Sequence, residues 1–222
     1  MMNSLIINFK NHPEIIGENS LKLAKSAEMV AKETGVRIII APPTPMLAFI
    51  ASRTSIPTYG QGVVNAASGQ STAAIIPETV IASGAKGTLV NHSEARLESA
   101  TIPSLVTRIR VVGLEVCLCI RTSEEARRYA QLQPNYIAVE PEELIGTGRS
   151  VSRVLPELIT STVNAARQAG FKNDILCGAG VTNAEDVKAA IRLGASGILV
   201  SSGVVKAADP YAALLELAKA MM

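Results

Sequence analysis

The sequence predicts a single-domain α/β protein whose strands and helices alternate eight times and close into a (β/α)8 barrel. Short β-branched runs alternate with longer helical patterns, and no linker or composition shift interrupts residues 1–222. The length of 222 residues also fits, because α/β barrels of about 200–250 residues commonly form one domain. We therefore expect one barrel domain that spans residues 1–222.

The predicted strands are short and mostly apolar throughout, which is typical of parallel strands buried on both faces. An open, doubly wound sheet is the alternative, but no Gly-x-Gly-x-x-Gly segment follows the first strand. Aromatic residues make up only 3% of the chain, so aliphatic side chains must fill the core. The predicted strands are Leu5–Phe9, Arg37–Ala41, Pro57–Gly60, Gly87–Asn91, Glu115–Ile120, Tyr136–Glu140, Asp174–Cys177 and Gly197–Ser201.

Capping signals predict where several helices begin. Thr122 with Glu125, and Thr182 with Glu185, have the spacing of a capping box. Asp209 followed by Pro210 predicts the start of a final helix over residues 211–222.

Glycines predict where four helices end, just before the next strand: Gly35, Gly113, Gly170 and Gly194. Two further helices, near Met46–Ser52 and Pro77–Ser83, are expected to be short.

Charge and cysteine content argue against several classes of protein. The net charge of +2 comes from scattered residues, so no nucleic-acid or membrane surface is indicated. No apolar run is long enough to span a membrane, and no signal peptide is expected. Cys117, Cys119 and Cys177 lack zinc-site spacing and suggest buried thiols in a reducing cytoplasm. We expect no metal and no organic cofactor.

Residues just past the C-terminal ends of the strands form the active site of a (β/α)8 barrel. Individually, a lysine there is usually a solvated loop residue, and a carboxylate can simply begin a helix. Together, the residues at these strand ends supply a base, a neutral hydrogen-bond donor, a cation and two turns rich in backbone N–H groups. This is the set needed for proton abstraction beside a carbonyl on a phosphorylated substrate. The candidate residues are Asn8, Lys10, His92, Glu94, Glu140, Gly180, Ser201 and Ser202.

The residue types suggest a division of roles. Glu140 takes a carbon-bound proton if burial raises its basicity. His92, as neutral imidazole, donates to a carbonyl oxygen that becomes an enediolate, and a turn beginning at Ser93 would disfavour its protonation. Lys10 offsets negative charge, and backbone N–H groups in the Gly180 and Ser201–Ser202 turns bind phosphate oxygens.

Four segments resemble those of triosephosphate isomerases, in the same order along the chain. Asn8-Phe9-Lys10 resembles their Asn-Trp-Lys segment, and residues 91–96 resemble Gly-His-Ser-Glu-Arg-Arg. Residues 138–148 are similar to Ala-Tyr-Glu-Pro-x-x-x-Ile-Gly-Thr-Gly, and residues 177–181 to Tyr-Gly-Gly-Ser-Val. The short length, and Asn91 before His92, resemble the compact archaeal branch. The resemblance implies a TIM barrel.

The resemblance also implies roles for individual residues. His92 is the electrophile, Glu140 is the base, and Asn8 and Lys10 contact the substrate, with Glu94 supporting Lys10. This pairing of a carboxylate base with a neutral histidine is established chemistry in the family. Backbone amides would bind the phosphate at Ile145, Gly146, Gly180, Ser201 and Ser202. Residues 142–148 would form a lid. Gly180 replaces the usual Ser and Ser201-Ser202 a Gly-Gly pair, but neither change removes an amide.

The predicted function is therefore the interconversion of dihydroxyacetone phosphate and D-glyceraldehyde 3-phosphate through an enediol(ate), a step of glycolysis and gluconeogenesis. One alternative is another phosphate-binding (β/α)8 lyase, which is disfavoured because no Lys ends the sixth strand. The other is a catalytically silent phosphate-binding barrel, which the joint presence of Lys10, His92 and Glu140 argues against.

A homo-oligomer built on a dimer is also expected, with a tetramer possible. Residues 61–76 are long for a connection after a strand, nearly uncharged and rich in small apolar groups, although the loop could instead fold back on its own barrel. In the family this loop docks on the partner barrel, with Thr72 at the matching tip. Ala74 and Ala95 occupy positions where the family often has an interfacial Glu and Arg. Because both charges are missing together, we expect an apolar, salt-insensitive contact.

Overall fold

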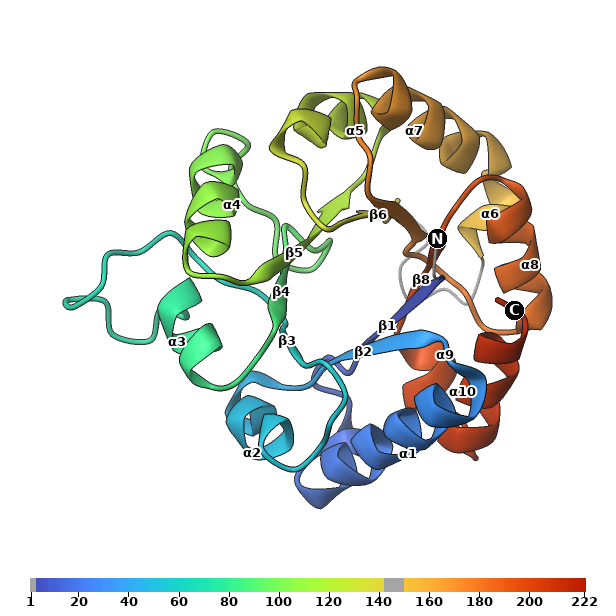
Figure 1. The fold of residues 1–222 in the computed structure, drawn as a ribbon, viewed down its shortest axis with the longest axis horizontal. Coiled ribbons are helices and arrows are strands. Elements are labelled where there is room, and N and C mark those ends of the chain that lie inside the picture. The colour runs from blue at the N-terminus through green and yellow to red at the C-terminus, as the bar shows by residue number, and fades with distance from the viewer. Residues whose placement is uncertain (1–2, 142–149) are drawn as a thin grey trace.

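The computed structural model describes residues 3–141 and 150–222, which form a single (β/α)8 barrel (Figure 1). All recorded strand pairs are parallel, and the order around the sheet is β2-β1-β8-β7-β6-β5-β4-β3. A parallel bridge between Ile40 and Thr58 links β2 to the β3 segment. The strands are β1 Ser4–Asn8, β2 Arg37–Ala41, β3 Tyr59–Gly60, β4 Gly87–Val90, β5 Glu115–Ile120, β6 Tyr136–Val139, β7 Asp174–Cys177 and β8 Gly197–Val200.

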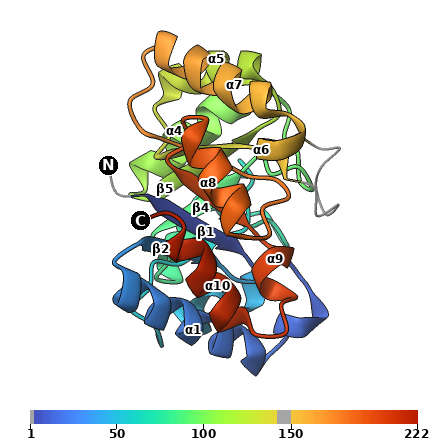
Figure 2. The same cartoon turned by 90° about the vertical axis from the view of Figure 1, so that its right-hand side faces the viewer.

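The helices form a ring outside the strands (Figures 1 and 2). The α-helices are α1 Glu18–Thr34, α2 Leu47–Ala51, α3 Pro77–Ala82, α4 Ile102–Val111, α5 Ser123–Tyr129, α6 Val151–Val154, α7 Pro156–Gln168, α8 Ala184–Arg192, α9 Ser202–Val205 and α10 Pro210–Lys219. Three 3-10 turns are η1 Pro13–Ile15, η2 Thr44–Met46 and η3 Ala130–Leu132.

The strands are buried on both faces, as their apolar sequences predict. In β1, Ile6 points into the barrel interior, where it joins an apolar cluster that includes Leu89 and Leu199. Its neighbours Leu5 and Ile7 belong to the layer between strands and helices. This alternation lets one short run of aliphatic residues contribute to both cores.

Most element boundaries agree with the sequence prediction to within one or two residues. The strand predicted over Pro57–Gly60 is shorter, because Thr58 makes only the isolated bridge. The final helix begins at Pro210 and ends at Lys219, before the predicted end at Met222. The four predicted helix-ending glycines all have positive φ, between 71° and 99°.

Two of the three capping predictions are confirmed and one is wrong. Asp209 caps α10 as predicted, since its carboxylate accepts the Ala212 N–H at 3.0 Å. The Thr122 hydroxyl accepts the Glu125 N–H, as predicted. Helix α8, however, begins one residue later than the Thr182–Glu185 box implies, since Asn183 is the N-cap and accepts the Asp186 N–H at 3.1 Å. The shift occurs because the buried Asp186 carboxylate accepts both the N–H and the hydroxyl of Thr182.

No helix among the described residues is long and apolar enough to cross a membrane.

Candidate active site

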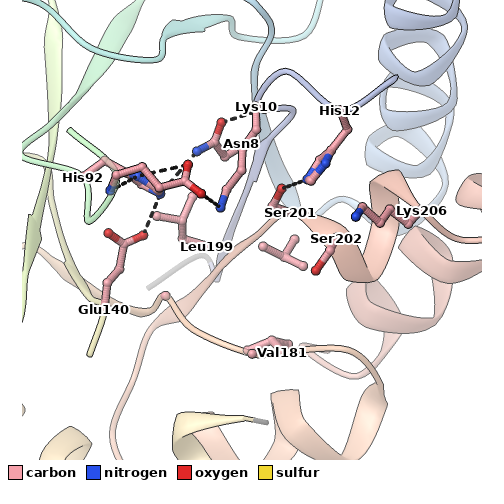
Figure 3. A pocket seen from close by; sticks show the side chains of 14 residues that line it. Asn8, Lys10, His12, His92, Glu140, Val181, Leu199, Ser201, Ser202 and Lys206 are labelled. Carbon is pink, nitrogen blue, oxygen red and sulfur yellow. Dashed lines mark hydrogen bonds and ion pairs between the residues drawn. The ribbon is translucent and has the colours of Figure 1, made fainter. Parts of the chain in front are cut away.

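A cavity of about 160 Å³ opens at the C-terminal ends of the strands (Figure 3). It collects every predicted site residue that the structure describes, namely Asn8, Lys10, His92, Glu94, Glu140, Gly180, Ser201 and Ser202. These residues lie at or just past the C-terminal ends of β1, β4, β6, β7 and β8, so only barrel closure brings them together.

Glu140 follows the last residue of β6 and is completely buried. Its Oε2 accepts the Ser93 N–H at 3.3 Å. Its Oε1 lies 3.3 Å from His92 Nε2 and makes no hydrogen bond within the described residues. Burial is the main cause that raises its pKa to about 7, although a hydrogen bond from Cys119 and the Ser93 N–H favour the charged form. A carboxylate in this environment can act as a base near neutral pH.

A glycine makes room for this carboxylate. A Cβ at Gly178, the first residue after β7, would lie 2.7 Å from the Glu140 Cγ and 3.0 Å from the Val139 carbonyl oxygen. The Gly178 N–H also donates to that carbonyl at 2.9 Å. The end of β7 therefore approaches β6 closely enough to confine the Glu140 side chain.

His92 lies on a loop that Asn91 holds in place. Asn91 has φ of 60°, a left-handed conformation that Asn tolerates better than most residues. Its side chain donates to the Cys119 carbonyl and accepts the Leu97 N–H, both at 3.0 Å. The first bond ties the loop after β4 to the end of β5, and the second holds the loop to itself.

The His92 ring is neutral and its tautomer is defined by the backbone. The Glu94 N–H donates to Nδ1 at 3.2 Å, so Nε2 carries the ring proton and faces the cavity. Burial, followed by the charge of Lys10, lowers the pKa of His92 to about 4. The predicted turn exists as the Ala95 N–H to His92 O bond, but it does not continue into a helix. Burial and Lys10, rather than a helix terminus, therefore keep the ring neutral.

Lys10 and Asn8 present polar groups beside this ring. The Asn8 side-chain oxygen accepts the Lys10 N–H at 3.0 Å, which directs the amide nitrogen toward His92 Nε2, 3.4 Å away. Lys10 adopts φ of 51°, and its ammonium lies 2.7 Å from a Glu94 carboxylate oxygen. The predicted Lys10–Glu94 proximity is thus observed. Two N–H donors and a cation therefore lie close together in the cavity, and one of them, His92 Nε2, is 3.3 Å from Glu140 Oε1.

The loops after β7 and β8 form the other wall. Gly180 has φ of 68°, which favours glycine. Gly203 packs against the first loop so closely that a Cβ would lie 2.7 Å from the Val181 carbonyl oxygen. The two loops are therefore locked together, with Ser201 and Ser202 at the cavity.

Comparison with known proteins supplies the family. A sequence model of the triosephosphate isomerase family matches residues 3–221. The triosephosphate isomerase of Methanocaldococcus jannaschii is 43% identical over 97% of this chain and 98% of its own length. Those of Cenarchaeum symbiosum and Pyrobaculum calidifontis are each 44% identical over 98% of this chain and 97% and 96% of their own lengths.

The chain belongs to the triosephosphate isomerase family. It is accordingly an isomerase of the compact archaeal type, and neither the lyase nor the silent-barrel alternative is favoured by these matches.

Two phosphate contacts predicted from the triosephosphate isomerase resemblance, Ile145 and Gly146, lie outside the described residues, as does the predicted lid over residues 142–148.

Among the ionisable residues that line the cavity, the sequence prediction missed two, His12 and Lys206 (Figure 3). His12 follows Lys10 by two residues, and Lys206 follows Ser202 by about one helical turn. No local pattern marks either residue, because His12 lies four residues past the end of β1 and Lys206 six residues past the end of β8.

Proposed function

We propose that this isomerase interconverts dihydroxyacetone phosphate and D-glyceraldehyde 3-phosphate through an enediol(ate), with Glu140 as base and His92 as electrophile. The reaction is a step of glycolysis and gluconeogenesis. The observation that carries the proposal is the buried Glu140 Oε1, free of hydrogen bonds among the described residues, beside the neutral His92 ring.

In the proposed reaction Glu140 removes a proton from the carbon next to the substrate carbonyl and returns it to the neighbouring carbon. The raised pKa of Glu140, about 7, matches its basicity to a neutral solution and lets the protonated form give the proton back. The same carboxyl group therefore serves both directions of the isomerisation.

His92 Nε2–H donates to the carbonyl oxygen as negative charge develops there. A neutral donor is suited to this role, because it stabilises the enediolate and transfers a proton between the two oxygens without a large pKa mismatch. The Asn8 amide nitrogen, 3.4 Å from Nε2, provides a second donor at the same position. Lys10 offsets the combined charge of enediolate and phosphate.

The phosphate is proposed to bind to backbone amides of Gly180, Ser201 and Ser202. The close packing of Gly203 on the Val181 carbonyl supports this subsite, since it fixes both loops before substrate arrives. Preorganised amides bind an anion without a cost for ordering the loops.

Replacement of Glu140 by Gln tests the assignment. Glu140→Gln keeps the shape and removes the basicity, so kcat in a coupled isomerase assay should fall by about 10²–10⁴-fold or more, with little change in affinity for a phosphate-bearing inhibitor. Glu124→Gln, an exposed carboxylate on α5, is the matched control. Turnover of Glu140→Gln within a few-fold of the parent would refute the assignment.

We further propose that the protein is a homodimer built on the loop of residues 61–76, with a tetramer as a possible larger assembly. This loop extends away from the barrel between β3 and α3 rather than folding back over it (Figure 1). Beside it, a mostly apolar cavity of about 320 Å³ is lined by Val63, Ile75, Ala74 and Ala95 and reaches His92. A second copy would cover these surfaces.

Light scattering across dilution, at low and high salt, tests the dimer. Ala74 and Ala95 leave no charge pair at these positions, so the dimer should persist in high salt. A fully active monomer at micromolar concentration would contradict the dimer, whereas dissociation by salt would contradict only its apolar character.

The three cysteines are free and buried, which supports a reducing cytoplasm as the compartment.

A further inference from the structure

Two basic side chains from distant parts of the chain, His12 and Lys206, line the cavity beside Ser201 and Ser202. His12 precedes η1, and its Nε2 lies 3.4 Å from the Ser201 hydroxyl oxygen. Lys206 follows α9. In the close-up view its ammonium lies beside Ser202, on the same side of the cavity as His12 (Figure 3). Glu140 and His92 occupy the other side of the cavity (Figure 3).

These groups differ from Lys10 in their electrostatic balance. Lys10 is paired with Glu94 at 2.7 Å, whereas Lys206 has no ion-pair partner among residues 3–141 and 150–222. Burial lowers the pKa of His12, and the charges of Lys206 and Lys10 lower it further. Glu14 and Glu94 act in the opposite direction but do not reverse the shift. The wall beside Ser201 therefore carries excess positive potential in the free protein.

We propose that His12 and Lys206 form a cationic clamp that binds the phosphate dianion of the substrate, with His12 taking up a proton from solvent as the dianion binds. The clamp rests on the proposed function, because it assigns further phosphate ligands in the same site. It adds side-chain charge to a subsite otherwise built from backbone amides of Gly180, Ser201 and Ser202.

The physical basis is that a bound dianion offsets the repulsion between protonated His12 and the neighbouring lysines. In the free protein a protonated His12 would face Lys206 and Lys10, which is unfavourable. A dianion placed between His12 and Lys206 reverses that balance and favours the imidazolium. By linkage, dianion binding strengthens as pH falls from the pKa of His12 in the complex to its lower pKa in the free protein.

The alternative role of Lys206 is purely structural, since a lysine just past a helix also interacts with the helix C-terminus. That role would affect stability but not the affinity for anions. Inhibition by sulfate separates the two roles. Sulfate stays a dianion throughout the neutral range, unlike a phosphate monoester, whose second pKa is about 6.

The experiment measures competitive inhibition of the isomerase by sulfate from pH 5.5 to 8.5, at constant ionic strength. Lys206→Ala should raise both the sulfate inhibition constant and the substrate KM by about ten-fold with little change in kcat, the effect of losing one charge-assisted hydrogen bond. Lys206→Arg should restore most of the affinity. Lys172→Ala, an exposed lysine just before β7 at the opposite mouth of the barrel, is the control.

His12→Gln tests the proton uptake. The parent should lose sulfate affinity as pH rises, and His12→Gln should show a smaller pH dependence. Because Glu140 also titrates near pH 7, the difference between parent and variant is the quantity that reports on His12. In NMR spectra of the parent, sulfate should raise the pKa of His12.

The outcomes distinguish the clamp from the proposed function. An active parent whose sulfate inhibition is unaffected by Lys206→Ala, or whose pH dependence survives His12→Gln unchanged, would overturn the clamp alone. A parent without isomerase activity would overturn the proposed function, and sulfate binding followed by NMR of His12 would still decide whether these two residues bind a dianion.

Discussion

Glu140 combines complete burial with a pKa near 7, and its neighbours cause both properties. Gly178 permits the end of β7 to cover the side chain, and the Ser93 N–H retains part of the stabilisation that water would give the charged form. Functional carboxylates of this kind lower the stability of the fold, because a charge is kept where water cannot solvate it.

Glu140→Gln should therefore be more stable than the parent at high pH. Burial raises the pKa of Glu140 from 4.5 to about 7 in the folded state, so folding favours the protonated carboxyl group. Its contribution to the free energy of unfolding is complete below about pH 4.5 and is lost as pH rises through 7. At pH 8 the variant should gain up to roughly 3 kcal/mol, and at pH 4 the gain should nearly vanish. Urea denaturation at fixed protein concentration measures this. A variant less stable than the parent at pH 8 would show that the buried carboxylate does not destabilise the folded state.

His92 should remain neutral throughout the working pH range of the enzyme. Burial and Lys10 lower its pKa to about 4, so NMR should show no titration of this ring between about pH 5 and 8. The chain has only two histidines, and His12→Gln identifies the other signal. A His92 midpoint near 6.5 would contradict the assigned role.

At the residue scale, the sequence predicted the cavity residues that lie at the ends of strands. It missed the cavity residues that lie several positions further along the chain. Asn8, His92 and Glu140 could be found because barrel topology puts strand ends at one mouth. His12 enters through the course of the loop before η1, which no local pattern specifies. Lys206 depends on a four-residue helix whose orientation is fixed by the packing of Gly203 on Val181.

At the element scale, strands were predictable because burial on both faces requires continuous apolar runs, and helix ends because glycine supplies positive φ. The start of α8 was not predictable from spacing. Thr182, Asn183, Glu185 and Asp186 offer two capping arrangements in sequence, and burial of Asp186 favours the later one. The Arg153 guanidinium, 2.6 Å from the Asp186 carboxylate, further favours it.

Two substitutions at α8 distinguish these arrangements. Asn183→Ala removes the observed N-cap and should lower the free energy of unfolding by about 1 kcal/mol. Glu185→Gln alters an exposed residue that pairs only with Lys188 among the described residues, and should change stability by less than about 0.5 kcal/mol. Chemical denaturation of both variants measures the difference, and the reverse order of effects would support the earlier cap.

At the scale of the whole molecule, the two mouths of the barrel have different tasks. At the N-terminal mouth, Arg37 on β2 makes two hydrogen bonds to the Glu115 carboxylate on β5, at 3.0 and 2.9 Å. Tyr59 also donates to Glu115. This network connects strands across the barrel and contains no residue of the active-site cavity.

Glu115→Gln should therefore affect stability alone. It removes the charge that pairs with the partly buried Arg37 and should lower the free energy of unfolding by about 1 kcal/mol, with kcat/KM unchanged. Glu140→Gln should instead raise the free energy of unfolding at high pH and lower kcat. Loss of activity in folded Glu115→Gln would show that the two mouths are coupled.

The most direct test of the central claim is NMR of the isomerisation run in deuterium oxide. If Glu140 moves the proton through an enediol(ate), the proton that it holds on its carboxyl group exchanges with solvent deuterium. The parent should therefore incorporate deuterium at the carbon next to the carbonyl. Glu140→Gln should form this product at least about 10²-fold more slowly. Rapid product formation by the parent without any deuterium would indicate direct hydride transfer between the carbons and would contradict the proposed role of Glu140.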